Sequence, residues 1–340
     1  MSKSDLVLVT GGSGFIATHI IVKLLNQGYR VRATLRTISR QDEVVSMLTK
    51  GGARDFSNLE FIHAELTSDE NWTEAAKGAK FVINVASPTP ATRPDDGDAM
   101  VKMAVDGATR VMKAAKSSGT KRVVLTSASG AVIAGHKHHP EIFTEEDWTD
   151  LSSNLDPYQR SKTMAEQASW EFSRKEGIEL SAVNPVAVMG PVLGKDFSHS
   201  NQIIRLMLTG KMPFLLRMNF DFVDARDVAD LHLLAMTSPQ AAGERFLATS
   251  GQNISYKDMA EILRRNFGEA AKRVSAREVP DALVKALAIF KKDMRMPAKF
   301  LGQNTACSNA KARNMLGWQP RPVEEAILAT AKSMIELGLV

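Results

Sequence analysis

The sequence contains a single cysteine, Cys307, among its 340 residues. One thiol cannot form an internal disulfide, which excludes a disulfide-stabilised secreted domain and favours a reducing compartment. No apolar run approaches the roughly 20 residues that a membrane-spanning helix needs, and no signal-peptide pattern precedes the first apolar segment. We therefore expect a cytoplasmic protein without membrane contact.

The chain has no large excess of basic over acidic side chains. The formal net charge is only +5, from 43 basic and 38 acidic side chains that are spread without long basic runs. A nucleic-acid partner would require a concentrated basic surface, so none is expected. The 44% of hydrophobic residues is typical of a globular protein, and the length allows about two domains.

Short apolar segments alternate with helix-like segments through the first half of the chain. The expected strands are residues 6–9, 30–35, 59–63, 81–85, 122–126 and 180–183. Such alternation is typical of a parallel sheet that is buried between helices. We predict an α/β fold, namely a doubly wound parallel Rossmann sheet with a smaller, mostly helical C-terminal cap that binds the substrate.

The less regular second half indicates how these two parts divide. Residues 1–184 should form the nucleotide-binding domain, and 222–250 should return to it, whereas 185–221 and 251–340 should form the cap. The cap offers mostly apolar side chains, which favour a small hydrophobic substrate. These candidates are Pro191 to Leu193, Phe197, Ile203, Met207, Phe214 and Phe220.

A glycine-rich turn follows the first expected strand. Gly11 permits the positive φ of a tight turn, Gly14 lets the backbone approach a pyrophosphate, and Ala17 lets the next helix pack closely. The start of that helix, with Phe15 and Ile16, faces the anion with free N–H groups and a partial positive charge. The motif predicts a dinucleotide site.

The end of the second expected strand distinguishes two cofactors. An NAD site usually has an acidic residue here for the adenosine ribose. This chain instead has Arg36 and, four residues on, Arg40, with Arg32 inside the strand. Guanidinium groups suit a 2′-phosphate because they are always charged and present forked donors. The expected cofactor is NADP(H), and a solvated basic loop is the alternative.

Tyr158 and Lys162 have the i, i+4 spacing that places both side chains on one helical face. A lysine cation close to a phenol favours the phenolate and lowers its pKa from about 10. Ser127 and Ser129 follow a buried strand, at the sheet edge where ligands bind, and their hydroxyls can polarise a carbonyl. These residue types together predict acid chemistry on a carbonyl group.

With these motifs, the chain resembles the extended short-chain dehydrogenase/reductase family, and within it the dihydroflavonol-reductase-like NADPH-dependent aldehyde and ketone reductases. The resemblance covers nearly the whole chain. Its segments are Val9–Ala17, Val31–Arg36, Asn84–Pro88, Val124–Ser127, Tyr158–Lys162, Ala182–Pro185, Phe222–Ala229 and Leu316–Trp318.

The resemblance implies a role for each residue of the site. Tyr158 would donate a proton, Lys162 would hold the nicotinamide ribose and lower the tyrosine pKa, and Ser127, or alternatively Ser129, would orient the carbonyl. The cofactor contacts would run from Arg36 and Arg40 at the 2′-phosphate, through Glu65 and Leu66 at the adenine and Val85, Ala86 and Ser87 along the pyrophosphate and ribose, to Pro185 and Val188 at the nicotinamide.

Two positions depart from the pattern of the resembled family. Ala128 stands where relatives often have a second serine, and Ile133 replaces an asparagine that helps to bind the flavonoid in plant reductases, which argues against flavonoid reduction. The expected activity is NADPH-dependent reduction of an aldehyde or ketone. The alternatives are an NAD-dependent nucleotide-sugar epimerase or dehydratase and a non-enzymatic NADP-sensing protein.

A histidine cluster, His136, His138 and His139, lacks a second group of ligands at metal-binding spacing. We therefore expect a solvated loop and no metal. For the assembly we expect a monomer or a homodimer.

Overall fold

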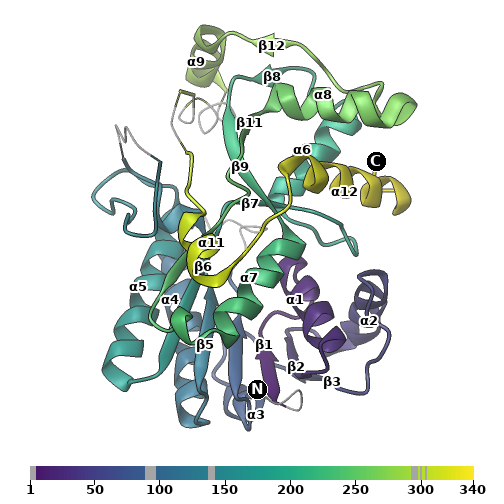
Figure 1. Cartoon of the computed structure of the whole chain (residues 1–340). Helices are drawn as coiled ribbons and strands as arrows, with labels where there is room; N and C mark the ends of the chain where they lie inside the picture. Colours follow the sequence, from purple (N-terminus) through teal and green to yellow (C-terminus); the bar gives the residue numbers. More distant parts are fainter. Residues whose placement is uncertain (1–4, 89–96, 137–141, 292–297, 299–300, 303–304) are drawn as a thin grey trace.

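The computed structural model describes residues 5–88, 97–136, 142–291, 298, 301–302 and 305–340. These residues form a large sheet with helices on both faces and a smaller part above the carboxyl ends of its strands (Figure 1). Within the described ranges, every helix is too short or too polar to cross a bilayer.

The large sheet has seven parallel strands in the order β10-β6-β5-β4-β1-β2-β3. They are β1 (Leu6–Val9), β2 (Arg30–Leu35), β3 (Leu59–His63), β4 (Phe81–Asn84), β5 (Arg122–Thr126), β6 (Glu179–Pro185) and β10 (Arg245–Ala248). The strand order reverses between β1 and β4, which creates the crevice in which sheets of this class bind ligands. The structure confirms the predicted Rossmann-type α/β fold.

Alternating side chains of each strand face opposite helical layers, because successive residues of a strand point to opposite faces. Val7 and Val9 of β1 belong to a core shared with α1 and α7, whereas Leu6 and Leu8 belong to a second core shared with α3 and α4. The helices of the large part are α1 (Phe15–Asn26), α2 (Gln41–Lys50), α3 (Trp72–Ala76), α4 (Gly97–Ser117), α5 (Pro157–Glu176) and α7 (Ala225–Thr237).

The smaller part contains two short sheets, β11-β9-β7 and β12-β8. Their strands are β7 (Ala187–Met189), β8 (Leu215–Leu216), β9 (Asn219–Asp224), β11 (Asn253–Ser255) and β12 (Glu278–Val279). The helices of the second half are α6 (His199–Leu208), α8 (Tyr256–Phe267), α9 (Asp281–Phe290), α11 (Ala310–Leu316) and α12 (Val323–Glu336). Between residues 190 and 198, the chain passes from β7 to α6 without a helix or strand.

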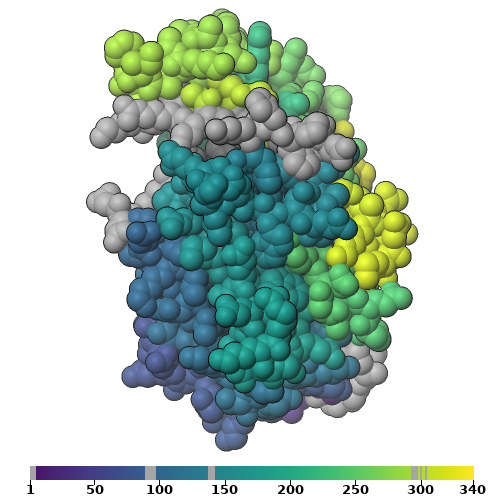
Figure 2. All heavy atoms as spheres, turned by 90° about the vertical axis from the view of Figure 1, so that its left-hand side faces the viewer, coloured from purple at the N-terminus to yellow at the C-terminus, as the bar shows by residue number. Residues whose placement is uncertain are grey.

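Figure 2 shows the side of the molecule on which α4 and α5 lie. Their atoms form a continuous blue-to-teal wall, and the light-green region of α9 and β12 lies at the top. The carboxyl ends of the seven parallel strands point toward this smaller part (Figure 1). Residues that follow those strand ends are therefore the ones that can meet both parts.

Candidate active site

The turn between β1 and α1 is too closely packed to accept side chains. Gly11 has a φ of +67°, and a Cβ atom placed there would lie 3.2 Å from Ala86. A Cβ atom on Gly12 would lie 2.8 Å from the Ala33 Cβ atom, a separation that real Cβ contacts essentially never show. Gly14 begins α1 without a side-chain cap. The turn therefore presents bare backbone at the helix N-terminus, which fits a pyrophosphate.

A buried hydrogen-bond pair joins this turn to the end of β4. The Thr10 hydroxyl donates to the Asn84 side-chain oxygen at 2.8 Å and accepts from the Ala86 amide at 2.9 Å. Thr10 and Asn84 are almost completely buried, whereas Val85, Ala86 and Ser87 are half-buried. The sequence did not single out Thr10 as a site residue. Its position directly before the glycine turn is the signal that could have found it.

The three arginines of the predicted phosphate site have different surroundings. Arg32 pairs with Glu60 at 2.8 Å, and its Nη1 atom donates to three carbonyl oxygens at the end of α3. Arg40 is bound to Glu43 and Asp196. Arg36 is exposed and has no ion pair or hydrogen bond with any part of the chain that the structure describes. Among the three, Arg36 is thus the guanidinium available to a ligand.

The predicted adenine residues, Glu65 and Leu66, lie just after β3 and are half-buried. Side-chain donors hold the backbone of this turn in place, because Trp72 Nε1 donates to the Glu65 carbonyl at 3.0 Å and Arg110 Nη1 donates to the Leu66 carbonyl at 2.7 Å. The Leu66 side chain packs against Gly107 of α4. A rigid, partly apolar turn is compatible with a planar base, and the contact itself stays a prediction.

Helix α5 positions the predicted acid pair. Asp156 caps the helix by accepting a hydrogen bond from the Tyr158 amide at 3.0 Å. Lys162 is buried one turn later, and its Nζ atom lies 6.0 Å from the Tyr158 ring centroid. The same Nζ atom donates to the Thr126 carbonyl oxygen at 3.3 Å, at the end of β5. The helix thus brings both groups to the carboxyl edge of the sheet.

The pKa values of this pair move in the directions that burial imposes. Burial raises the pKa of Tyr158 to about 12, and the negative charge of Asp156 adds to the effect. Burial lowers the pKa of Lys162 to about 8, and Glu166 opposes this shift. The sequence predicted a lowered tyrosine pKa, and the structure corrects this, because loss of solvation disfavours the phenolate. Tyr158 therefore retains its proton at neutral pH.

The two candidate serines occupy different environments. Ser127 is 5% exposed, and its hydroxyl donates to Glu166 Oε2 at 2.5 Å. Ser129 begins the short 3-10 helix η3 (Ser129–Ala131) and is half-buried. Its hydroxyl has no hydrogen-bond partner within the described ranges. The structure thus holds Ser127 in a buried contact and leaves the proton of Ser129 available.

Glu166 is the centre of a buried polar network beneath the acid pair. Its Oε2 atom also accepts from Asn184 Nδ2 at 2.8 Å, and its Oε1 atom accepts from Arg245 Nε at 2.7 Å. Glu166 is fully buried. Its partners are Ser127, directly after β5, Asn184 in β6 and Arg245 at the start of β10. The network therefore fixes three strand ends relative to α5. Of its residues, Ser127 was predicted as a site residue, whereas Glu166 and Arg245 were not, although the spacing of Glu166, four residues after Lys162, repeats that of the acid pair.

The remaining predicted cofactor residues lie at the ends of β6 and β7. Pro185 is buried and pairs in register with Ala248 of β10. Val188 is 7% exposed, and its carbonyl accepts from the Ser198 hydroxyl at 2.9 Å. Phe15 is also buried in α1, and Ile16 is half-buried beside it. Contact of these side chains with a cofactor stays a prediction.

The apolar residues predicted to close the substrate pocket are not equivalent. Met207 is fully buried in the main core, and Val192 and Leu193 are nearly so. Phe214 is 53% exposed, whereas Phe220 is half-buried and lies 5.6 Å from the Tyr256 ring. Met207 therefore has a structural role, and the partly exposed aromatic residues remain the candidates for substrate contact.

The predicted histidine loop is only partly described, because His138 and His139 lie outside the described residues. The ring Nε2 atom of His136 forms a hydrogen bond with the Trp148 carbonyl at 3.0 Å. Across the described residues, no group of three or more histidine, cysteine or acidic side chains is placed to hold a metal ion.

Comparison with known proteins relates this chain to a family of nucleotide-dependent enzymes. Residues 7–248 match the family described as NAD dependent epimerase/dehydratase. The chain is 33% identical to cinnamoyl-CoA reductase 1 of Petunia hybrida over 99% of this chain and 94% of that protein. It is 29% identical to dihydroflavonol 4-reductase of Zea mays over 79% of this chain and 76% of that protein.

Among solved structures, yeast methylglyoxal/isovaleraldehyde reductase Gre2, complexed with NADPH, is similar in fold. The TM-score is 0.80 at 24% identity, with 98% of this chain and 100% of that chain covered. The likeness extends over both the large sheet and the smaller part.

Proposed function

Because this chain belongs to the NAD dependent epimerase/dehydratase family, we propose that it is an NADPH-dependent reductase of small hydrophobic aldehydes or ketones. One observation carries the proposal: a protonated Tyr158 and a buried Lys162 lie at the carboxyl edge of the sheet that also carries the bare glycine turn. The named reductases among its relatives support an oxidoreductase that acts on a carbonyl group.

Tyr158 acts as the general acid in this proposal. When bound, NADPH supplies a hydride to the carbonyl carbon. The Tyr158 phenol donates its proton to the carbonyl oxygen as negative charge develops there, so the product is an alcohol. Lys162, with a pKa of about 8, is still mostly cationic at pH 7 and stabilises the phenolate that remains. This division of roles needs a neutral tyrosine at the start, and a phenol whose pKa lies well above 7 is neutral at that pH.

Ser129 orients the substrate carbonyl in this mechanism. A serine hydroxyl has one proton to donate, and Ser127 donates it to Glu166. Ser127, the residue favoured by the sequence, is the alternative if that bond is exchanged for a substrate. Ser129→Ala should therefore reduce kcat/KM more than Ser127→Ala, and steady-state kinetics of both variants decide between them.

Arg36 binds the 2′-phosphate of NADPH in this proposal. It follows the last residue of β2 directly, is exposed and has no partner among the described residues, so no internal bond is lost when it binds a ligand. An arginine forms charge-assisted, forked hydrogen bonds with phosphate, which an NAD ribose cannot provide.

The test is the loss of NADPH absorbance with hydrophobic aldehydes, ketones and diketones, run in parallel with NADH. Turnover that prefers NADPH is expected. Tyr158→Phe should lower kcat by about 100- to 10,000-fold while leaving NADP⁺ binding intact. The matched control is Tyr29→Phe. It removes a phenol hydroxyl just beyond the carboxyl end of α1, whereas the glycine turn lies at the start of that helix. Full activity of Tyr158→Phe, or NADPH binding without turnover of any carbonyl, would overturn the proposal.

A further inference from the structure

Arg40, which the sequence places at the 2′-phosphate, already has two carboxylate partners. Its Nε and Nη2 atoms donate to the Glu43 carboxylate at 2.8 and 3.0 Å. Its Nη2 atom also donates to Asp196 Oδ2 at 2.6 Å. Glu43 lies on α2, three residues from Arg40, whereas Asp196 comes from 156 residues away, on the segment between β7 and α6.

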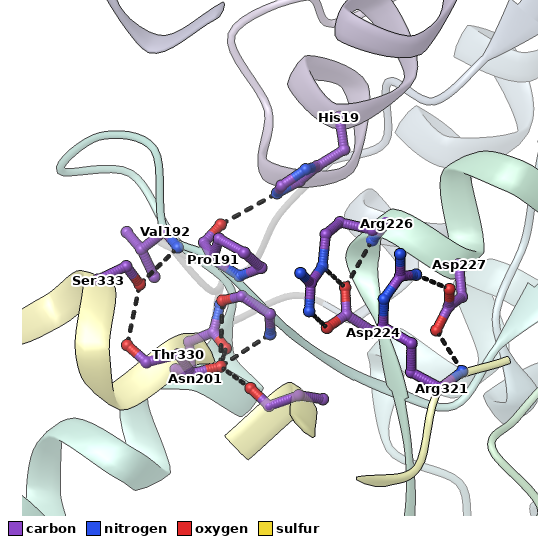
Figure 3. Close-up of polar contacts among 12 residues, drawn as sticks. His19, Pro191, Val192, Asn201, Asp224, Arg226, Asp227, Arg321, Thr330 and Ser333 are labelled. Carbon is purple, nitrogen blue, oxygen red and sulfur yellow. Dashed lines mark hydrogen bonds and ion pairs between the residues drawn. The ribbon is translucent and has the colours of Figure 1, made fainter. Parts of the chain in front are cut away.

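This segment, residues 190–198, is here called the strap. Its first half is fixed to α1 and α12 (Figure 3). Three hydrogen bonds do so: His19 Nε2 with the Pro191 carbonyl oxygen (3.0 Å), the Val192 amide with Ser333 Oγ (2.8 Å) and the Gly190 amide with Thr330 Oγ1 (2.7 Å). Burial lowers the pKa of His19 to about 4, so its ring is neutral and Nε2 carries the proton that the carbonyl accepts.

Close packing then brings the middle of the strap against α2. Leu193 is 5% exposed, and a Cβ atom on Gly51, just after α2, would lie 3.0 Å from its Cδ1 atom. A Cβ atom on Gly194 would lie 3.0 Å from the Met47 side chain. The strap backbone is thus held up to residue 194, and Asp196 reaches Arg40 from a defined position.

From this geometry we propose that Asp196 is a specificity-determining residue of the cofactor site. Its carboxylate occupies a guanidinium that a 2′-phosphate would otherwise bind, so it competes with the phosphate and limits the preference for NADPH over NADH. The inference rests on the proposed NADPH cofactor. It follows because a phosphate that approaches Arg40 meets the negative charges of both Glu43 and Asp196.

Asp196, rather than Glu43, is the exchangeable partner. The Asp196 side chain is 57% exposed, so water can replace the guanidinium at little cost. Glu43 binds Arg40 through two nitrogen atoms and stays within reach because both residues lie in one helical region. A bound phosphate can therefore displace Asp196 while Glu43 keeps Arg40 oriented.

Calorimetry with 2′,5′-ADP and 5′-AMP tests the proposal without any turnover, because the two probes differ only in the 2′-phosphate. Asp196→Asn should lower the Kd for 2′,5′-ADP by roughly two- to fivefold and leave the Kd for 5′-AMP unchanged. In an Arg40→Gln background the same substitution should have no effect. Glu324→Gln, which removes a carboxylate paired with Arg265 on the cap, is the charge-matched control and should change neither value.

Three outcomes would overturn the role of Asp196. These are weaker binding of 2′,5′-ADP, an equal change for both probes, and an effect that persists without Arg40. Failure of the NADPH assignment would appear elsewhere, as a wild-type protein that binds 5′-AMP as tightly as 2′,5′-ADP. Even then, the ratio of the 2′,5′-ADP Kd of the wild type to that of Asp196→Asn decides whether the carboxylate competes.

Discussion

Two arginine–carboxylate pairs of similar length have opposite surroundings. Arg245 of β10 and Glu166 of α5 lie 2.7 Å apart, with side chains that are 8% and 0% exposed. Arg40 and Asp196 lie 2.6 Å apart where the strap passes α2, with side chains that are 32% and 57% exposed. A buried charge that loses its partner cannot be rescued by water, whereas an exposed one can. The two pairs therefore differ in solvent exposure and not in distance. Burial gives the first pair a structural role, and exposure makes the second pair exchangeable.

The largest expected effect comes from breaking the buried pair. Arg245→Met would remove the ion-pair partner of the Glu166 carboxylate, which should lower the free energy of unfolding by about 3–5 kcal/mol. Urea unfolding measures this change. Adding Glu166→Gln should restore part of the loss, because the amide removes the unpaired charge and keeps an oxygen that can accept from Ser127 and Asn184. A loss below about 1 kcal/mol for the single variant would show that the pair is not structural.

Charge reversal of Arg36, which is exposed and has no partner among the described residues, should act on binding rather than on folding. Arg36→Glu should raise the Kd for NADPH by about 10- to 100-fold, because one charge-assisted phosphate contact is lost. The Kd for NADH should stay the same. Fluorescence titration with both cofactors measures the difference, and equal losses would refute the phosphate assignment.

The free energy of unfolding should also depend on pH through the buried Lys162 side chain. The folded pKa of Lys162 is about 8, below its ordinary value of 10.5, so the unfolded chain holds more protons between these limits. The cost of burying this cation is complete below pH 8 and disappears as the pH rises to 10.5. Stability relative to Lys162→Met should therefore increase across this window by about 3 kcal/mol. Denaturant unfolding from pH 7 to 10 checks the sign, and a flat difference would contradict it.

The smallest effect should come from removing the exposed pair. Arg40→Met should change the free energy of unfolding by less than about 1 kcal/mol, because the solvent replaces the lost contacts of Asp196. The same urea assay as for Arg245→Met gives a direct comparison. A loss as large as that of Arg245→Met would show that exposure does not distinguish the two pairs.

Most of the large sheet could be predicted because the local sequence indicates where its strands begin and end. Residues 6–9, 30–35, 59–63 and 122–126 are strands at the predicted bounds, since each is a short segment with closely spaced apolar side chains. The strand β10 was missed. It is four residues long and begins with Arg245, whose charge is neutralised by Glu166, 79 residues away. Helix α9 was also missed, because exposed Leu283, Ile289 and Phe290 blur its amphipathic pattern.

The candidate site was predictable where sequence spacing sets the geometry. The glycine turn and the Tyr158–Lys162 pair depend on neighbouring residues, and the structure places them at the same sheet edge. The contacts of Ser127 with Glu166 and of Arg40 with Asp196 join residues far apart in the sequence. No local pattern predicts them. The direction of the Tyr158 pKa shift was wrong for the same reason, because burial is a property of the fold.

The Glu166 network also contains two of the four tryptophans of the chain. The Arg245 guanidinium lies 3.7 Å from the Trp148 ring centroid, and Trp170 donates its indole N–H to Glu166 at 3.2 Å. Indole emission responds to a nearby charge and to the hydrogen bond of its N–H group. Half of the tryptophans of this protein therefore contact the Glu166–Arg245 pair, so the protein carries a built-in optical reporter of this part of its scaffold.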